Sequence, residues 1–197
     1  MLEYETMSLQ LDTPALSTCV FGTRMTADEF LALPESPIHY ELIDGVVVMA
    51  PAASFGHQDI AGELLYQIRR FLETHPIGRA VADVDVKLRE GLVYRPDLVF
   101  LSAEKAARVR RGVLEPPDLI VEILSPESRQ RDTRTKRDDY QSAGVGEYWL
   151  IDPQDHVMRF LVLRSGVYQD APSGATHFAS TILAGMRLDL ARIQKLF

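Results

Sequence analysis

Two apolar stretches of this chain each carry an acidic residue where a buried strand would normally exclude one. Asp97 lies within residues 94–101 and Glu122 lies within residues 117–125, and both stretches are rich in apolar and β-branched residues. This composition favours buried strands. Because a buried carboxylate is costly unless it is paired or binds a metal, the two residues predict a site for a hard divalent cation on neighbouring strands.

The remaining pattern predicts a mixed fold. Apolar residues recur at spacings of three and four between about residues 54 and 73, as on one face of a long helix. Residues 40–49 predict a hairpin that turns at Asp44-Gly45, and residues 80–88 alternate as a single strand would. Further strands are predicted at residues 147–152, 157–163, 167–169 and 178–183, and shorter helices at 26–33, 103–110, 133–143 and 190–197. Asp132 is the predicted N-cap of the helix at 133–143. This order indicates an α/β (α+β) fold, a mixed central sheet flanked by helices.

Length and composition bound the organisation of the chain. Residues 1–23 show no firm period and predict a flexible leader, whereas residues 24–197 predict a single domain. No apolar run approaches the roughly 20 residues that span a bilayer, so no membrane partner is expected. The acidic N-terminus lacks the pattern of a signal peptide, and Cys19 is the only cysteine. These features predict a cytoplasmic protein.

The charge of the chain limits how it could bind nucleic acid. Its formal net charge of −7 argues against non-specific coating of a polyanion. Local basic patches are nevertheless available at residues 105–111 and 129–137, and the second follows directly after the Glu122 stretch. An enzyme that binds nucleic acid through one such patch is compatible with this distribution.

A lysine near the two acids would complete a site for phosphodiester hydrolysis. Carboxylate oxygens suit Mg²⁺, and a lysine supplies positive charge where the transition state gathers negative charge. The position two residues after Glu122 is Leu124, which cannot do this. Lys136 is the best substitute, since Asp132, Lys136 and Tyr140 recur at spacings of four on one helical face. Lys87, which shares a strand face with Asp85, is the alternative.

Pro96-Asp97, followed by Glu122-Ile123-Leu124 and a lysine on the next helix, resembles the PD-(D/E)XK nuclease superfamily. More narrowly, the chain is similar to the Uma-type family of restriction-endonuclease-like proteins. The similar segments are residues 40–45, 95–100, 116–126 and 143–152, spread over residues 24–165.

The resemblance implies a restriction-endonuclease-like fold, and it assigns a role to individual residues of this chain. Asp97 and Glu122 would bind Mg²⁺ or Mn²⁺, Lys136 would be the displaced catalytic lysine, and Glu41 would precede the site on the first helix–hairpin unit. DNA is the implied substrate. Apolar residues of the C-terminal strands could pair with a second copy, which leaves a homodimer open.

Three functions are therefore compared. The first is an Mg²⁺-dependent endonuclease that hydrolyses DNA. The second is a non-catalytic interaction protein that keeps the nuclease fold, and the third is a metal-dependent hydrolase of a smaller phosphorylated substrate. His57, at the start of the long predicted helix, either lines the cleft or lies on the surface.

Overall fold

The structure is a computed structural model that describes residues 20–109 and 115–197. The predicted leader, residues 1–23, lies almost wholly outside the described part. Its last residues are described, and with Arg24 they run beside residues 46 and 47. The Gly22 N–H donates to the Val47 carbonyl, and Arg24 forms a β-bridge with Val46. None of the helices in the described part combines the length and apolar composition that a membrane crossing requires.

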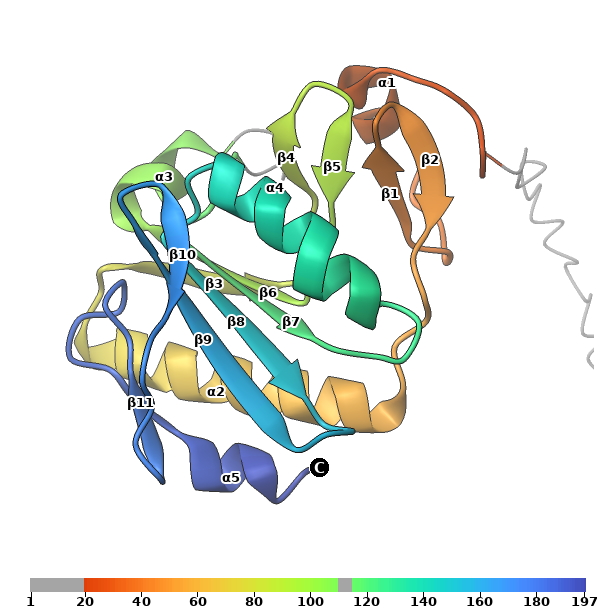
Figure 1. Ribbon diagram of the computed structural model, residues 1–197. Coiled ribbons are helices and arrows are strands. Elements are labelled where there is room, and N and C mark those ends of the chain that lie inside the picture. The colour runs from red at the N-terminus through yellow and green to blue at the C-terminus, as the bar shows by residue number, and fades with distance from the viewer. Residues whose placement is uncertain (1–19, 110–114) are drawn as a thin grey trace, which may run out of the picture.

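A six-stranded mixed sheet forms the centre of the fold (Figure 1). Its strands lie in the order β10-β9-β8-β7-β6-β3, and only β7 and β8 pair in parallel. Their bounds are β3 Gly78–Ala82, β6 Leu98–Ser102, β7 Leu119–Ile123, β8 Glu147–Asp152, β9 Val157–Arg164 and β10 Val167–Asp170. Glu122 therefore lies on an inner strand of this sheet, as the sequence predicts.

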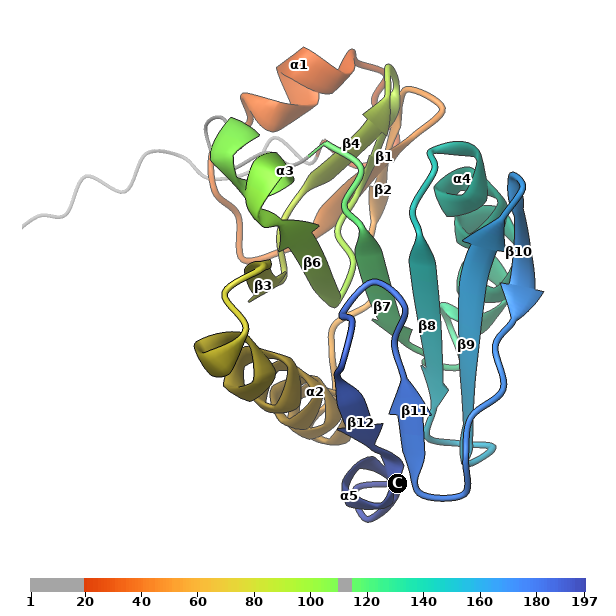
Figure 2. The ribbon, with the colours of Figure 1, turned by 90° about the vertical axis from the view of Figure 1, so that its left-hand side faces the viewer.

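A smaller four-stranded sheet, in the order β2-β1-β5-β4, stands beside one end of the large sheet (Figure 2). It consists of β1 Tyr40–Ile43, β2 Val46–Met49, β4 Val86–Arg89 and β5 Leu92–Tyr94, and helix α1 Ala27–Leu31 packs on it. The predicted β1–β2 turn is confirmed, because Asp44 and Gly45 adopt φ of 49° and 73°. Residues with positive φ at both central positions match the twist of a tight hairpin.

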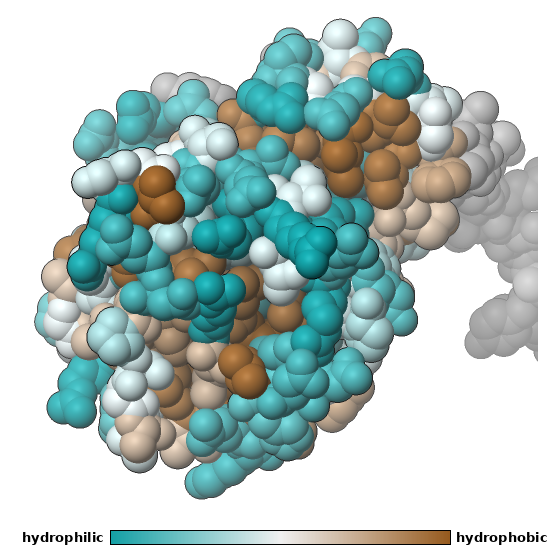
Figure 3. Space-filling model, viewed as in Figure 1, coloured by the Kyte–Doolittle hydropathy of each residue, from teal (hydrophilic) through white to brown (hydrophobic). Residues whose placement is uncertain are grey.

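Helices cover both faces of the large sheet (Figures 1 and 2). Helix α2 Phe55–Thr74 buries Ile60, Leu64 and Ile68 against one face, together with β11 His177–Ala179, β12 Arg187–Asp189 and α5 Leu190–Gln194. A π-helical segment, η1 Arg131–Lys136, and helix α4 Arg137–Ser142 cover the other face. Helix α3 Ala103–Arg108 follows β6. On the α4 side the surface is largely hydrophilic, with a hydrophobic area over the small sheet (Figure 3).

Alternation along β7 directs Glu122 toward α4. Val121 and Ile123 pack in the core under α2, whereas Ile120 and Leu124 pack in the core under α4. Because successive side chains of a strand point to opposite faces, Glu122 belongs to the α4 face. A buried carboxylate there needs partners from the helix that covers it.

Three sequence predictions about strands are wrong. Residues 80–88 do not form one strand, because Asp83 adopts a φ of 54° and the chain passes from β3 in the large sheet to β4 in the small one. Asp97 does not lie within a strand but directly precedes β6, after Pro96, which has no N–H for a strand ladder. Residues 178–183 form a strand only at their start, in β11.

Asp132 is not the N-cap of the helix after β7. Helical structure begins before it, and the π-helical segment contains it. The Tyr148 hydroxyl donates to the Asp132 carbonyl (3.1 Å), and the Thr133 hydroxyl donates to the Arg129 carbonyl (2.6 Å). These side chains satisfy carbonyls that α-helical hydrogen bonds would otherwise occupy, and that allows the wider turn.

Candidate active site

Glu122 and Lys136 form the centre of a buried cluster of charges. The Lys136 ammonium donates to Glu122 Oε1 at 2.9 Å and lies 3.0 Å from Glu41 Oε1 and 3.5 Å from Asp132 Oδ1. Each of these four residues is at most 4% exposed. We call them the buried ion cluster. They come from β1, β7 and η1, so the cluster joins both sheets to the helix that covers them.

Neighbouring groups fix the carboxylates of the buried ion cluster. The Tyr140 hydroxyl donates to Glu122 Oε1 (2.8 Å), and the Arg95 main-chain N–H donates to Glu41 Oε1 (3.2 Å). Arg131 lies 3.4 Å from Glu41 Oε2. The Lys136 ammonium also lies 5.2 Å from the centre of the Tyr94 ring, in reach of a cation–π interaction. The lysine is therefore fully enclosed by acceptors and aromatic surface.

Asp97 lies next to Glu122, at the start of β6. The register pairs Leu98 with Val121, so one residue further it brings Asp97 opposite Glu122. The Ile123 N–H donates to Asp97 Oδ2 at 2.7 Å, which anchors the carboxylate to β7. Unlike the buried ion cluster, the Asp97 side chain is 21% exposed and can meet solvent.

His57 contacts Asp97, a pairing that no spacing in the sequence indicates. The Ser54 hydroxyl accepts the His57 N–H and caps helix α2, and the ring then lies with Nε2 3.2 Å from Asp97 Oδ2. Burial alone lowers the pKa of His57, but Asp97 and the Ile123 main chain outweigh it and raise the pKa above its usual value. His57 thus lines the site, which decides between the two sequence-based readings of this residue.

Lys87 lies elsewhere. It pairs with Asp28 at 3.0 Å and Glu90 at 3.2 Å, beside the small sheet. Asp85 pairs with Arg95 at 2.9 Å. Of the two candidate lysines, only Lys136 contacts Glu122.

The electrostatics of the site are dominated by burial and by excess negative charge. Burial, reinforced by Asp132, Asp97 and Glu41, raises the pKa of Glu122 to about 8, although Lys136 opposes the shift. Burial alone would lower the pKa of Lys136, yet its carboxylate neighbours raise it well above normal. The lysine is therefore charged, and an ionised Glu122 requires further positive charge nearby.

The fold agrees with comparisons to known proteins. A solved structure of a putative nuclease of the DUF820 family from Anabaena variabilis is similar, with a TM-score of 0.73 and 22% sequence identity. The match covers 87% of this chain and 98% of that chain. At this identity the likeness shows that the two chains share a fold, the mixed sheet flanked by helices that the sequence predicts. No curated protein matches the chain.

A comparison with models of protein families gives more direct evidence of the family than the structural likeness does. The model named Uma2, described as "putative restriction endonuclease", matches residues 27–191, which is most of the chain. The match spans the elements that supply Glu41, His57, Asp97, Glu122 and Lys136. The chain therefore belongs to the Uma2 family.

Proposed function

We propose that this protein hydrolyses DNA phosphodiester bonds with a divalent cation, Mg²⁺ or Mn²⁺, held by Asp97 and Glu122. The observation that carries the proposal is the adjacency of these two carboxylates at the end of the β6–β7 pair. One oxygen of each is already held by the protein. Among the described residues, no donor binds the second oxygen of either carboxylate. The family description supports a nucleic-acid substrate.

The charges of the site fit a divalent cation. Four carboxylates and two cations meet here: Glu41, Asp97, Glu122, Asp132, Arg131 and Lys136. With His57 neutral and all four carboxylates ionised, as a bound cation would favour, four negative and two positive charges give a formal charge of −2. Buried oxygens of Glu41 and Asp132 also accept no hydrogen bond from the described residues. Both features favour the approach of a doubly charged ion.

The donor set suits an ion that keeps much of its water. No group of three or more acidic, histidine or cysteine side chains converges as a metal cage in the described part of the chain. Mg²⁺ commonly uses only one or two carboxylates and retains several waters, so the Asp97–Glu122 pair is sufficient. When bound, such an ion would polarise the scissile phosphate and acidify a coordinated water.

The residues of the chain then have distinct roles. Asp97 faces solvent and would meet the substrate side of the site, whereas Glu122 would hold the ion from within the sheet. Lys136 favours the ionised form of Glu122 and orients it, and a divalent ion would supply the further positive charge that this ionisation requires. The charge of the lysine would also help to stabilise negative charge that develops on the phosphate. Glu41, through its 3.0 Å contact, holds the Lys136 ammonium in place.

Cleavage of supercoiled plasmid DNA tests the proposal. In Mg²⁺ or Mn²⁺, Asp97→Asn and Glu122→Gln should each lower the cleavage rate at least about 100-fold, because each removes a charged ligand. Asp118→Asn is the matched control. Its carboxylate is also 21% exposed, and it accepts the Ser102 N–H at 2.7 Å, the same distance as the Asp97 bond.

Equal cleavage by the native protein and both variants would refute the assignment. Calorimetric titration with Mn²⁺ separates the other two functions. Absence of Asp97-dependent heat would support the non-catalytic protein. Asp97-dependent heat, with hydrolysis of a small phosphodiester but not of DNA, would support the hydrolase of smaller substrates.

His57 is proposed to position Asp97. It shares Asp97 Oδ2 with the Ile123 N–H, which leaves the other oxygen without a donor among the described residues. His57→Leu should weaken Mn²⁺ binding about 10–100-fold, as loss of a group that orients a metal ligand does, whereas His57→Gln keeps a donor and should retain most affinity. Calorimetry on both variants, with His75→Leu at the other end of α2 as control, measures this. Equal affinity in the leucine and glutamine variants would exclude the role.

A further inference from the structure

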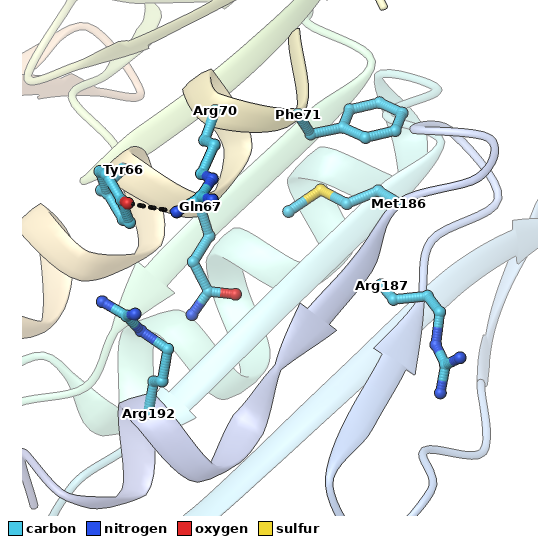
Figure 4. Close-up of a pocket in the computed structure, with 7 residues that line it drawn as sticks. All are labelled: Tyr66, Gln67, Arg70, Phe71, Met186, Arg187 and Arg192. Atoms are coloured by element: carbon cyan, nitrogen blue, oxygen red, sulfur yellow. Dashed lines mark hydrogen bonds between the residues drawn. The ribbon is translucent and has the colours of Figure 1, made fainter. Parts of the chain in front are cut away.

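A second concave site lies between helix α2 and the C-terminal elements. A cavity of about 340 Å³ opens between the second half of α2, strand β12 and helix α5 (Figure 4). None of its lining residues belongs to the buried ion cluster. Along α2, Arg70 lies 13 residues after His57, which is about 20 Å at the usual rise of a helix. The cavity is thus separate from the candidate active site.

Arginine side chains give this cavity a positive charge. Arg70, Arg187 and Arg192 line it, and no acidic residue does. Glu63 neutralises Arg192 through two short contacts, at 2.6 and 2.8 Å. Within the described ranges, Arg70 and Arg187 form no ion pair, so two guanidinium groups stay uncompensated. This local excess stands out in a chain whose net charge is −7.

An aromatic ring organises two of the arginines. The Arg70 guanidinium donates to the Tyr66 hydroxyl at 2.7 Å, and the guanidinium groups of Arg70 and Arg192 lie 6.0 and 5.4 Å from the centre of the Tyr66 ring. Figure 4 shows the Arg70–Tyr66 contact and Arg192 on the same side of the cavity, with Arg187 across from them. Because Glu63 already compensates Arg192, Arg70 is the guanidinium beside this ring that has no acidic partner among the described residues.

The walls of the cavity are held together by hydrogen bonds between the Gln67 side chain and the main chain of Asp189. Gln67 donates to the Asp189 carbonyl at 3.1 Å and accepts the Asp189 N–H at 2.8 Å, which ties α2 to the junction of β12 and α5. Phe71 and Met186 supply apolar surface at one side. The cavity therefore presents uncompensated guanidinium groups, a half-exposed phenol ring and apolar wall on a rigid frame.

We propose that this cavity binds a phosphate ester whose base or sugar packs on Tyr66. Guanidinium groups match phosphate oxygens in geometry and charge, and they stack on aromatic rings. A cavity of this volume lies at the lower end of the range for small-molecule sites and suits one nucleotide unit. The phosphate could belong to a free mononucleotide or to the backbone of a nucleic acid. Binding in this cavity does not depend on the proposed cleavage of DNA.

Binding in EDTA tests the site without the candidate active site, because no divalent ion is then available. The probes are adenosine monophosphate and an eight-nucleotide single-stranded DNA with and without a 5′-phosphate, titrated by calorimetry. The double variant Arg70→Gln/Arg187→Gln should weaken binding of each probe that the native protein binds at least about tenfold. Arg164→Gln, an exposed arginine on β9 outside the cavity, is the charge-matched control.

The probes separate the two sources of phosphate. Binding of the mononucleotide identifies a free nucleotide, whereas binding of the DNA alone identifies the backbone. A preference for the 5′-phosphorylated strand identifies a chain end. No binding of any probe, or equal binding by the double variant, would overturn the proposal. Because both substituted arginines are exposed, unchanged thermal unfolding should accompany the loss of binding.

Discussion

Replacing Lys136 by methionine should cost about 3–5 kcal/mol of unfolding free energy, the usual penalty for leaving buried charges unpaired. Methionine nearly matches the length of lysine but removes the ammonium from Glu41, Glu122 and Asp132, which would then repel one another in a site closed to water. Urea unfolding in metal-free buffer measures the change. Added Glu122→Gln should restore part of the stability, because it removes one of the stranded charges.

Lys87→Met is the matched control for this prediction. Lys87 also contacts two carboxylates, but its side chain is 30% exposed. Solvent screening limits such pairs to about 1 kcal/mol or less, so this variant should unfold nearly as the native protein does. Similar losses in both lysine variants would contradict the view that the buried ion cluster supports the fold. The same pair in the plasmid assay compares the two candidate catalytic lysines.

Substitution of Glu147 by glutamine should destabilise the protein by about 2–4 kcal/mol although Glu147 lies outside the candidate active site. This carboxylate is fully buried at the start of β8 and has no cation partner in the described residues. It instead accepts hydrogen bonds from Trp149 Nε1, the Ser180 hydroxyl, and the main chain and hydroxyl of Thr181. The side-chain amide of glutamine has N–H groups in place of one carboxylate oxygen, so on that side donors of the protein would face donors of the amide.

Fluorescence reports this change directly, because Trp149 is the only tryptophan and its indole N–H lies 2.9 Å from Glu147. Glu147→Gln should shift the emission of the native state and lower the midpoint of unfolding. Thr181→Val, which removes one donor and leaves the carboxylate bound by the others, should cost only about 1 kcal/mol. If Glu147→Gln unfolds at the same midpoint as the native protein, the hydrogen bonds to Glu147 contribute little to stability.

Local patterns predicted those parts of the fold that local forces determine. The apolar stripe of α2, the turn at Asp44-Gly45 and the strand around Glu122 depend on residues near one another in the chain. Predictions failed where the chain changes partners. Asp83 and Pro96 mark two points at which the chain passes directly from a strand of one sheet to a strand of the other, and alternation of apolar residues carries no information about which sheet receives a strand.

The candidate site was only partly accessible from sequence for a similar reason. Helical spacing predicted that Asp132 and Lys136 share a face, but the contact of Lys136 with Glu41 joins residues 95 positions apart. The sequence alone leaves open whether His57 lines the cleft or lies on the surface, because one histidine near a helix start has no diagnostic spacing. The assignment of catalytic and metal-binding roles stays a prediction that the cleavage and Mn²⁺ experiments address.

The π-helical segment makes the candidate site sensitive to chain length in an unusual way. A π turn accommodates one residue more than an α turn, so losing a single residue between 131 and 136 would let the helix close into regular α geometry. The helix before and after the segment would keep its relative orientation, because the deletion removes only the extra residue that the wider turn accommodates. If the lost residue lies between Asp132 and Lys136, their spacing falls from four residues to three, and the 3.5 Å contact between them has to be remade. A one-residue deletion here would therefore show whether the buried ion cluster needs the wider turn itself, because the rest of the helix keeps its packing.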